Sequence, residues 1–562
     1  MMKSFIVALQ TQLSLVIGFA LSLVVSYFYI IAGDARFPVE NPNVMWFGFL
    51  TSSILFGLGT YLARKYPQAT PMNLREGAVS VFLTWVFAVT ISACVFVLAG
   101  FPIPNGDFSL IRSFIDGVFE SISGYTTAGG SILPSVEVFP RSVLFWRSFT
   151  HFLGGMGMAY MAITLLRGFR FKRETIINAE AEGPNYTKFD DEPSAIEAGV
   201  DFLKIYSLLT LVLFLLLVIS GALFRTTGYS TWYDDVFDSA THSFSVMGTG
   251  GFGTYDASAG LPISENGVNV VGGLRNPVSE WIIAIFMFIA GSNLALWFVL
   301  IYKRRVRDFF ASKELRTYTA VVVLITIGIW LILLGNNSYS SAINALRYAF
   351  FNVTTIISTT GLATTDFTTW PTAAEGLLFI CYLIGGMVGS TAGGLKVLRF
   401  MVLYKYVVNK VRNLLQGKHI TRFQIDGVTY DESSSGLIMA NIVLYFMAFM
   451  LGAVLIMLTS SNITLIDGTK SAADFTSAVT ASIANLGNIG PAVEIGNINA
   501  GPTGNYFAYS EASKLVMSGL MLIGRLGIVT IITLFITRRG MDSYDDSIEG
   551  VHFDSDEPLL QK

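Results

Sequence analysis

The chain has 562 residues, of which 52% are hydrophobic and only 13% are charged. Soluble globular proteins average about 25% charged residues, so this composition excludes an ordinary soluble protein and indicates a membrane protein with many spans. The net charge of −3 says little, because the placement of charge in the loops of a membrane chain matters more than its sum. Cys94 and Cys381 are the two cysteines and both lie in apolar stretches, which excludes a disulfide framework and a CxxC metal site.

Apolar runs of about 20 residues are long enough to cross a bilayer as helices. The first run begins after Lys3 and has no small-residue cleavage site, so we expect a retained helix and not a signal peptide. The expected spans are 5–33, 45–64, 76–100, 141–166, 199–225, 276–302, 317–336, 374–404, 434–460 and 512–537. Their even number places both termini on one side.

Basic residues gather in one set of loops and are sparse in the other, where Arg36, Arg112 and Lys470 are scattered. Because cytoplasmic loops are enriched in Lys and Arg, the basic face and both termini are expected to be cytoplasmic, in an inner (plasma) membrane protein. The basic loops contain Arg64–Arg75, Arg167–Arg173, Lys303–Arg316, Lys405–Arg422 and Arg538–Arg539.

Four polar, glycine-rich runs interrupt the apolar pattern. Aligning Gly129, Gly250, Gly361 and Gly490 gives a fourfold repeat, with an apolar span on each side of every run. An amphipathic segment long enough for a short helix precedes each run, at Ile111–Tyr125, Tyr233–Val246, Ala342–Ile357 and Ser471–Leu486. Unpaired backbone cannot face lipid, so the runs are expected to line a water-filled path or to be buried in protein.

The expected fold is an all-α polytopic membrane protein. It has four pseudo-repeated helix–pore helix–filter loop–helix units around a central pore, plus an N-terminal two-helix hairpin. The expected divisions are 1–66 (hairpin), 67–173 (pore repeat 1), 174–310 (cytoplasmic loop and pore repeat 2), 311–423 (pore repeat 3 with a broken gating helix), 424–540 (pore repeat 4) and 541–562 (acidic cytoplasmic tail).

The glycine runs suit a cation filter. A desolvated alkali cation needs a ring of oxygens, which backbone carbonyls supply, and glycine allows the φ values and close approach that such a ring requires. The alternative is four ordinary outside loops with glycines in tight turns. The candidate metal-binding filter residues are Thr126, Thr127, Gly129, Gly248, Thr249, Gly250, Thr359, Thr360, Gly361, Asn488, Ile489 and Gly490.

The span 374–404 contains five glycines within residues 385–394. Each glycine inside a helix costs about 1 kcal/mol relative to alanine, so a break is expected there, forming a flexible loop across the path below the filter. The alternative is close helix packing through small residues. The candidate gate residues are Gly385, Gly386, Met387, Gly389, Ser390, Thr391, Gly393, Gly394, Lys396 and Arg525.

Arg525 lies near the middle of the last span. A charge at that depth costs at least about 2.5 kcal/mol, so it is expected to face the pore or a polar partner. Its guanidinium could bond the carbonyls of the broken segment, and the alternative is a buried ion pair.

Other polar residues have weaker roles. Glu120, Asp256, Asp366 and Glu494 could concentrate cations near the filter, although each alone is more typical of a solvated position. Two further expectations concern packing. His151 and His242 are expected to pack as polar groups beside the pore, and Asn293 to form an interhelical hydrogen bond.

From about Glu76 to Thr537 the chain resembles the TrkH branch of the Trk/Ktr/HKT superfamily of potassium transporters. The residues that carry the resemblance are Ser123–Gly129, Trp146–Thr150, Leu153–Gly157, Thr249–Phe252, Ser358–Gly361, Gly389–Lys396, Asn488–Pro491 and Met521–Gly527.

The resemblance implies potassium selectivity, since glycine occupies the filter position of the first run. It also implies an intramembrane gate at the broken segment, held by Arg525. The family often has an acidic residue two positions after this arginine, where this chain has Gly527. An arginine–carboxylate pair with that neighbour is therefore not expected.

The resemblance further implies a homodimer that sits on cytosolic TrkA-like RCK nucleotide-binding subunits. Basic stretches 303–316 and 405–422 are the candidate docking surface. The acidic loop Glu174–Ala198 and the acidic tail after Arg539 are expected to be solvated and partly disordered.

The expected function is a potassium uptake pore with K+ as the transported ion, regulated by the cytosolic subunit. An ion-coupled symporter is the second class, but it would need titratable carboxylates along the path, and apart from Glu120, near the outer mouth, none is expected in a clear span. A membrane enzyme is not expected, because the chain has no HExxH, no Walker A loop and no Ser/His/Asp set. No nucleotide is expected on this chain, and the partners are the lipid bilayer and protein, with no nucleic acid.

Overall fold

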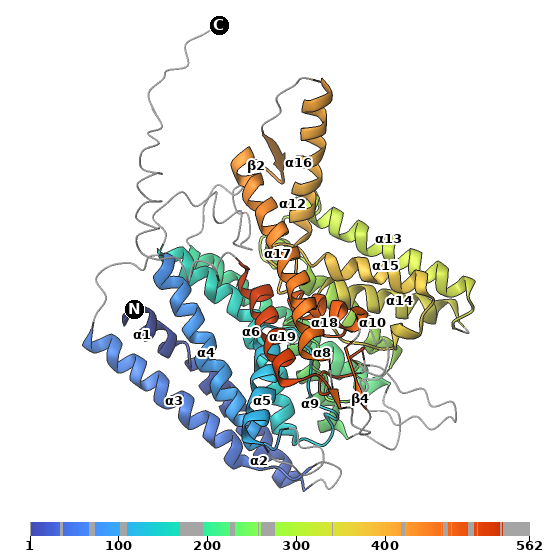
Figure 1. The fold of residues 1–562 in the computed structure, drawn as a ribbon. Coiled ribbons are helices and arrows are strands. Elements are labelled where there is room, and N and C mark those ends of the chain that lie inside the picture. Colours follow the sequence, from blue (N-terminus) through green and yellow to red (C-terminus); the bar gives the residue numbers. More distant parts are fainter. Residues whose placement is uncertain are drawn as a thin grey trace.

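The computed structural model describes residues 2–33, 38–66, 74–101, 109–168, 195–224, 231–256, 258–259, 276–339, 341–416, 422–461, 463–464, 470–473, 475–492, 500–502, 504–528 and 531. These residues form a helical body (Figure 1). Its elements are α1 (Met2–Gln10), α2 (Leu13–Ala32), α3 (Pro42–Lys65), α4 (Leu74–Leu98), α5 (Leu110–Tyr125), α6 (Arg141–Gly168), α8 (Ala195–Leu223), α9 (Trp232–Met247), α10 (Pro277–Gly291), α11 (Leu294–Ile301), α12 (Val306–Ala311), α13 (Lys313–Gly335), α14 (Ala342–Ile357), η1 (Phe367–Thr369), α15 (Thr372–Leu383), α16 (Val397–Gln416), β1 (Phe423–Ile425), β2 (Val428–Tyr430), α17 (Glu432–Thr459), β3 (Ile463–Thr464), β4 (Lys470–Ser471), α18 (Phe475–Leu486) and α19 (Glu511–Leu526).

Six helical stretches in the described part of the chain are long and apolar enough to cross a membrane, or seven if one bent pair counts as a span. They are Met2–Ala32, Pro42–Lys65, Val79–Leu98, Val200–Leu223, Lys313–Gly335 and Ser434–Thr459, with Pro277–Gly291 and Leu294–Ile301 as the bent pair. Six of the ten predicted spans are therefore present as apolar helices, and the predicted span 141–166 coincides with α6.

The other three predicted spans are not straight helices. The span 276–302 bends by 103° between α10 and α11. The side chain of Asn293 accepts a hydrogen bond from Ala295 N and caps α11, so the predicted interhelical role of Asn293 is wrong. The span 374–404 is broken between Leu383 and Val397. In the span 512–537, α19 ends at Leu526, because Gly527 has φ 80° and cannot continue the helix.

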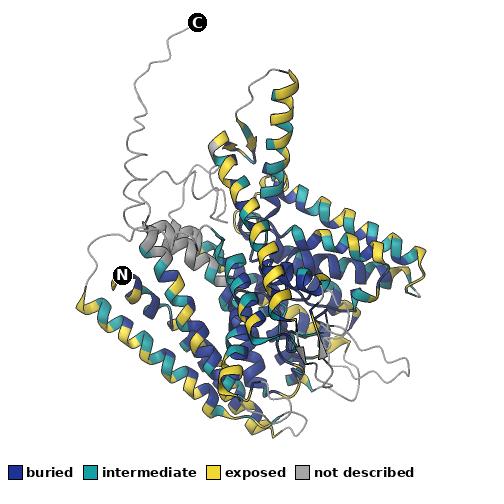
Figure 2. Cartoon of the chain, in the orientation of Figure 1, coloured by how far each residue is buried: buried dark blue, intermediate teal, exposed yellow. Residues whose placement is uncertain are grey.

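The packing is organised around four helix pairs, each joining a long helix to the short helix that follows it. These pairs are α4 with α5, α8 with α9, α13 with α14, and α17 with α18. The short helices coincide with the four amphipathic segments expected before the glycine runs. Figure 2 shows buried residues gathered at the centre of the body and exposed ones along α3 and α16. The helices α1, α2 and α3 pack against α4 and α6 at one side.

Two short antiparallel hairpins depart from the expected all-α fold: β1 with β2, and β3 with β4. Asp426 and Gly427 join β1 to β2 with φ values of 50° and 85°. Two successive left-handed residues are typical of the type I′ turn, for which Asp-Gly between apolar residues is the usual sequence. This turn is the local reason that a hairpin forms between α16 and α17.

Candidate functional site

The C-terminal ends of α5, α9, α14 and α18 share one backbone geometry. The residue three positions after the last residue of each helix donates its N–H to a carbonyl five residues earlier, which satisfies one of the free carbonyls at a helix end in a Schellman motif. The pairs are Ala128 to Ser123 (2.9 Å), Gly250 to Ser245 (2.8 Å), Thr360 to Thr355 (2.8 Å) and Ile489 to Ala484 (2.8 Å).

A left-handed residue precedes each of these donors, with φ between 53° and 55°. The residues are Thr127, Thr249, Thr359 and Asn488. Glycine is the usual residue there, and a β-branched residue at this φ is an outlier that costs about 1–2 kcal/mol. The side chains make contacts that glycine could not. Thr359 Oγ1 accepts from Gly393 N at 2.8 Å, and Asn488 Nδ2 donates to Met521 O at 3.0 Å.

The shared geometry corrects the alignment of the second run. A left-handed glycine follows each Thr or Asn by two residues, at Gly129, Gly251, Gly361 and Gly490, with φ from 76° to 96°. The counterpart in the second run is therefore Gly251 and not Gly250. Three glycines within residues 250–253 left this register open to a shift of one residue. Gly250 has a different constraint, since a Cβ there would overlap the imidazole of His151.

The four runs touch one another in a closed ring. A Cβ on Gly129 would overlap Gly250 O, and a Cβ on Gly251 would overlap Thr360 O.

The third and fourth runs continue the same contact pattern. A Cβ on Gly361 would overlap Ile489 O, and one on Gly490 would lie 2.7 Å from Ala128 O. Run 1 thus contacts run 2, run 2 contacts run 3, run 3 contacts run 4, and run 4 returns to run 1. Glycine is needed at all four positions by both φ and space.

A cavity lies against this ring. Its lining includes the four left-handed glycines, together with Arg147, Asp256 and Tyr506. The cavity wall comes from the glycines and the residues that follow them, including Gly130, Ser131 and Pro491. Segments that are hundreds of residues apart in the chain therefore share one opening.

Glu120 and Arg147 form a buried ion pair behind the cavity. Arg147 Nε lies 2.5 Å from Glu120 Oε1, and both side chains are buried. Glu120 also accepts from Ser131 Oγ and Ile132 N, each at 3.0 Å, while Arg147 donates to Gly253 O at 3.1 Å. A buried pair is tolerated when hydrogen bonds satisfy both partners. The pair therefore ties the first run to the second, and the expectation of a solvated Glu120 is wrong because α5 turns this residue inward.

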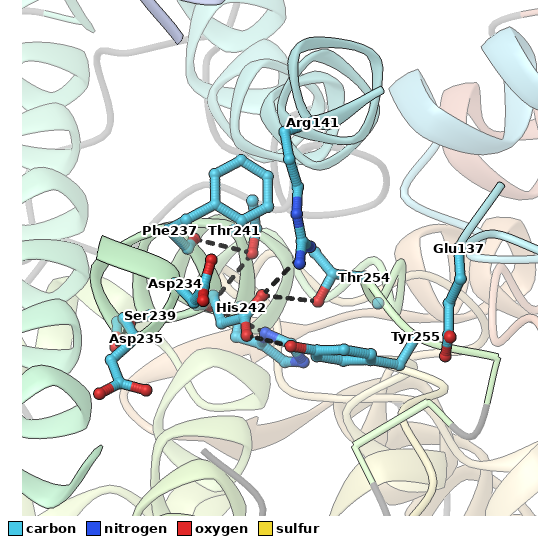
Figure 3. Close-up of polar contacts among 12 residues, drawn as sticks. Glu137, Arg141, Asp234, Asp235, Phe237, Ser239, Thr241, His242, Thr254 and Tyr255 are labelled. Carbon is cyan, nitrogen blue, oxygen red and sulfur yellow. Dashed lines mark hydrogen bonds and ion pairs between the residues drawn. The ribbon is translucent and has the colours of Figure 1, made fainter. Parts of the chain in front are cut away.

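Asp238 on α9 holds the segment that follows the second run. Figure 3 shows Thr254, Tyr255 and Arg141 pointing toward this part of α9. Its carboxylate accepts from Thr254 Oγ1 at 2.9 Å and from Tyr255 Oη at 2.5 Å. Arg141 of α6 lies 3.8 Å from the same carboxylate and 4.9 Å from the Phe237 ring. Sequence reasoning missed this cluster, although an acidic residue inside an apolar re-entrant segment was a usable indication of a buried partner.

The predicted break in 385–394 is present, since residues 384–396 lie between α15 and α16 without helical structure. A continuous helix packed through small residues is therefore excluded. Besides the bond to Thr359, Thr391 Oγ1 donates to Met247 O at 2.9 Å, and Met387 N donates to Gly291 O at 2.8 Å. The loop thus contacts the helix ends that precede the second and third runs.

The predicted gate residues within the loop lie together. Met387, Ser390, Thr391 and Lys396 are all buried. Lys396 Nζ donates to Ala392 O at 2.5 Å, which closes the loop on itself. Left-handed φ values occur at two of its glycines, Gly389 and Gly394.

Arg525 links the loop 384–396 to α6. Its guanidinium donates to Thr391 O at 2.6 Å and to Gly154 O of α6 at 2.9 Å. The predicted bond to a carbonyl of the broken segment is therefore confirmed. The cost of burying the Arg525 guanidinium is offset by its hydrogen bonds to these two main-chain carbonyls.

The remaining predicted residues have structural partners or lie outside the described residues. His151 spans the first helix end and the second run, through Gly124 O at 3.0 Å and Phe252 N at 3.2 Å. Asp256 accepts from Val136 N, and Asp366 accepts from Thr368 N. Glu494, most of the acidic loop Glu174–Ala198 and the tail after Arg539 are not among the described residues.

Comparisons with known proteins agree on one family. Residues 40–546 match the TrkH family, described as cation transport protein. The Trk system potassium uptake protein TrkH of Escherichia coli K12 is 28% identical over 464 residues, which cover 83% of this chain and 86% of that protein. The protein of the same description from Halomonas elongata is 28% identical over 499 residues, covering 87% and 92%.

A solved structure shares the fold. The crystal structure of the potassium transporter TrkH from Vibrio parahaemolyticus matches with a TM-score of 0.73 and 23% identity, and covers 96% of this chain and 99% of that one. With the apolar helices described above, this likeness identifies a polytopic, multi-pass helical membrane protein. The prediction that the chain is not an enzyme agrees with membership of a transport family. The chain belongs to the TrkH family of cation transport proteins.

Proposed function

We propose that this chain is a potassium uptake pore in which the four glycine runs form the selectivity filter. The observation that carries the proposal is the closed ring, in which each left-handed glycine faces a carbonyl oxygen of the next run. A ring of backbone carbonyls can replace the water shell of a desolvated K+. The relatives named as potassium uptake proteins support K+ as the cargo.

The four short helices are the pore helices of four pseudo-repeats. Each ends at a glycine run, so its partially negative C-terminus points toward the ring and favours a cation there. The repeats correspond to 67–173, 174–310, 311–423 and 424–540, and residues 1–66 form the additional N-terminal hairpin. The filter residues are those predicted above with Gly251 added.

The loop 384–396 acts as the gate. Its contacts with Met247, Gly291 and Thr359 support this role, because these residues lie where helices end at the ring, whereas the cavity adjoins the residues after the glycines. Arg525 holds the loop through Thr391 O. An ion leaving the filter on that side therefore meets this loop next.

The proposed assembly is the one that the resemblance to the family implies. The pore is a homodimer in the inner (plasma) membrane with both termini cytoplasmic, and TrkA-like RCK subunits bind nucleotide and regulate it. The partners dock on 303–316 and 405–422, and this chain itself binds no nucleotide.

An ion-flux assay tests the function. Purified chain in liposomes should take up K+ or Rb+ down an inside-negative potential, and Na+ much more slowly. A chain that passes Na+ as readily as K+ would contradict the filter. If K+ uptake occurs only when a proton or sodium gradient is also applied, a coupled symporter would be favoured instead.

A further inference from the structure

Glu314 attaches the loop 384–396 to the start of α13. The residue lies in the first turn of α13 and is buried. Its Oε1 accepts a hydrogen bond from Val388 N at 2.9 Å, and its carboxylate also interacts with the backbone of Leu398 in the first turn of α16. One carboxylate therefore bridges the middle of the loop and the helix that follows it.

Asp426 in turn holds the first turn of α13. Its Oδ1 accepts from Lys313 N at 2.7 Å, and its Oδ2 accepts from Glu314 N and from Ser312 Oγ, each at 3.1 Å. A carboxylate at a helix N-terminus satisfies free N–H groups and interacts favourably with the helix dipole. The cap comes from the tip of the β1–β2 hairpin, more than 100 residues away in the chain.

Glu314 therefore contacts both the hairpin, through its backbone, and the loop, through its side chain. Glu314 N donates a hydrogen bond to the Asp426 carboxylate, and the Glu314 carboxylate accepts one from Val388 N. Within the hairpin, Ile425 and Tyr430 are buried and the Asp-Gly turn fixes the register of β1 with β2.

Within the described residues, the hairpin belongs to a part that projects from the helical body. Figure 1 shows β2 and α16 rising, beside the start of α17, away from the other helices, with α12 at their base. Lys405 of α16 donates to Gln424 O of β1 at 2.7 Å, so the helix and the hairpin are linked. The hairpin that carries Asp426 is therefore joined to α16.

We propose that the β1–β2 hairpin is a regulatory lever, which through Asp426 and the positioning residue Glu314 holds the loop 384–396 in its obstructing conformation. Displacement of the hairpin removes the cap from α13, shifts Glu314 and frees the Val388 amide, so the loop can leave the pathway. This inference rests on the proposed function, in which that loop is the gate.

The first test is hydrogen–deuterium exchange of the full-length chain in detergent. Asp426→Ala and Glu314→Ala should each speed exchange in peptides covering 384–398 by roughly three- to tenfold, the factor expected when one hydrogen bond is lost. Glu314→Gln keeps a neutral acceptor for Val388 N and should restore most of the protection. Asp431→Ala is the matched control, because Asp431 caps α17 by accepting from Ser434 N at 2.8 Å and, among the described residues, makes no hydrogen bond to the loop 384–396.

The second test is Rb+ uptake by the same variants in liposomes. The two alanine variants should raise uptake several-fold with an unchanged ratio of K+ to Na+ flux, and the Asp431→Ala control should match the parent chain. Asp426→Asn retains the side-chain size and one acceptor, so it should give a smaller change in both exchange and uptake. It replaces Asp426→Ala in both tests if the alanine variant fails to fold.

The outcomes separate the lever from the pore. Unchanged exchange in folded Asp426→Ala and Glu314→Ala chains would overturn the lever, while selective uptake by the parent chain would still support the filter. Faster exchange with unchanged uptake would also overturn the proposal, since the freed loop would not be the barrier. Equal Na+ and K+ uptake by the parent chain would instead refute the proposed function, whatever the exchange data.

Discussion

Replacing Gly361 with alanine tests the ring at its third run, where both the backbone conformation and the lack of space oppose a side chain. Its φ of 78° costs an L-residue about 1–2 kcal/mol. The added Cβ would overlap Ile489 O and would lie 2.9 Å from Pro491 Cδ, so the third and fourth runs must move apart. A change of 1–2 kcal/mol in the relative free energy of two bound ions alters their ratio roughly 5- to 30-fold. We therefore expect the ratio of K+ to Na+ flux to fall by about that factor.

The assay is competitive Rb+ and Na+ uptake into liposomes, with thermal unfolding measured on the same preparation. Gly376→Ala is the matched control, because Gly376 lies inside α15 and a Cβ there would have no atom within 4 Å. The control should retain selectivity and stabilise its helix by roughly 0.5–1 kcal/mol, the usual advantage of alanine over glycine. An unchanged flux ratio in folded Gly361→Ala would refute the reasoning from the ring.

Two further changes probe the charges around the pore. Arg525→Ala removes the donor to Thr391 O and should raise Rb+ uptake without changing selectivity; uptake equal to that of the parent chain would leave the arginine a purely structural role. Lys514→Met removes the partner of Asp116, 2.6 Å away in a pair that is fully buried, and should lower stability by about 3–5 kcal/mol, because an unpaired charge remains buried. The double variant Asp116→Leu/Lys514→Met should recover most of that loss in thermal unfolding, and failure to recover would contradict a cost arising from the unpaired charge.

Sequence reasoning located the helices and the glycine runs more reliably than their register. The short helix Ala342–Ile357 was predicted with both ends correct, because an amphipathic segment there ends at a clear polar run. The second run was aligned one residue early, at Gly250, since consecutive glycines carry no side-chain pattern from which to choose. Asn293 was assigned to an interhelical bond, whereas it caps α11 after a 103° bend.

The amino-acid sequence by itself determined the membrane class, the four interruptions of the apolar pattern and the break at five clustered glycines. These features are local, since each depends on composition or spacing within a few turns of chain. The tertiary structure alone decided which carbonyl faces which glycine, that Glu120 pairs with Arg147, and that Asp426 caps α13. Such contacts join residues far apart in sequence, and their geometry depends on how the helices pack, which no single segment specifies.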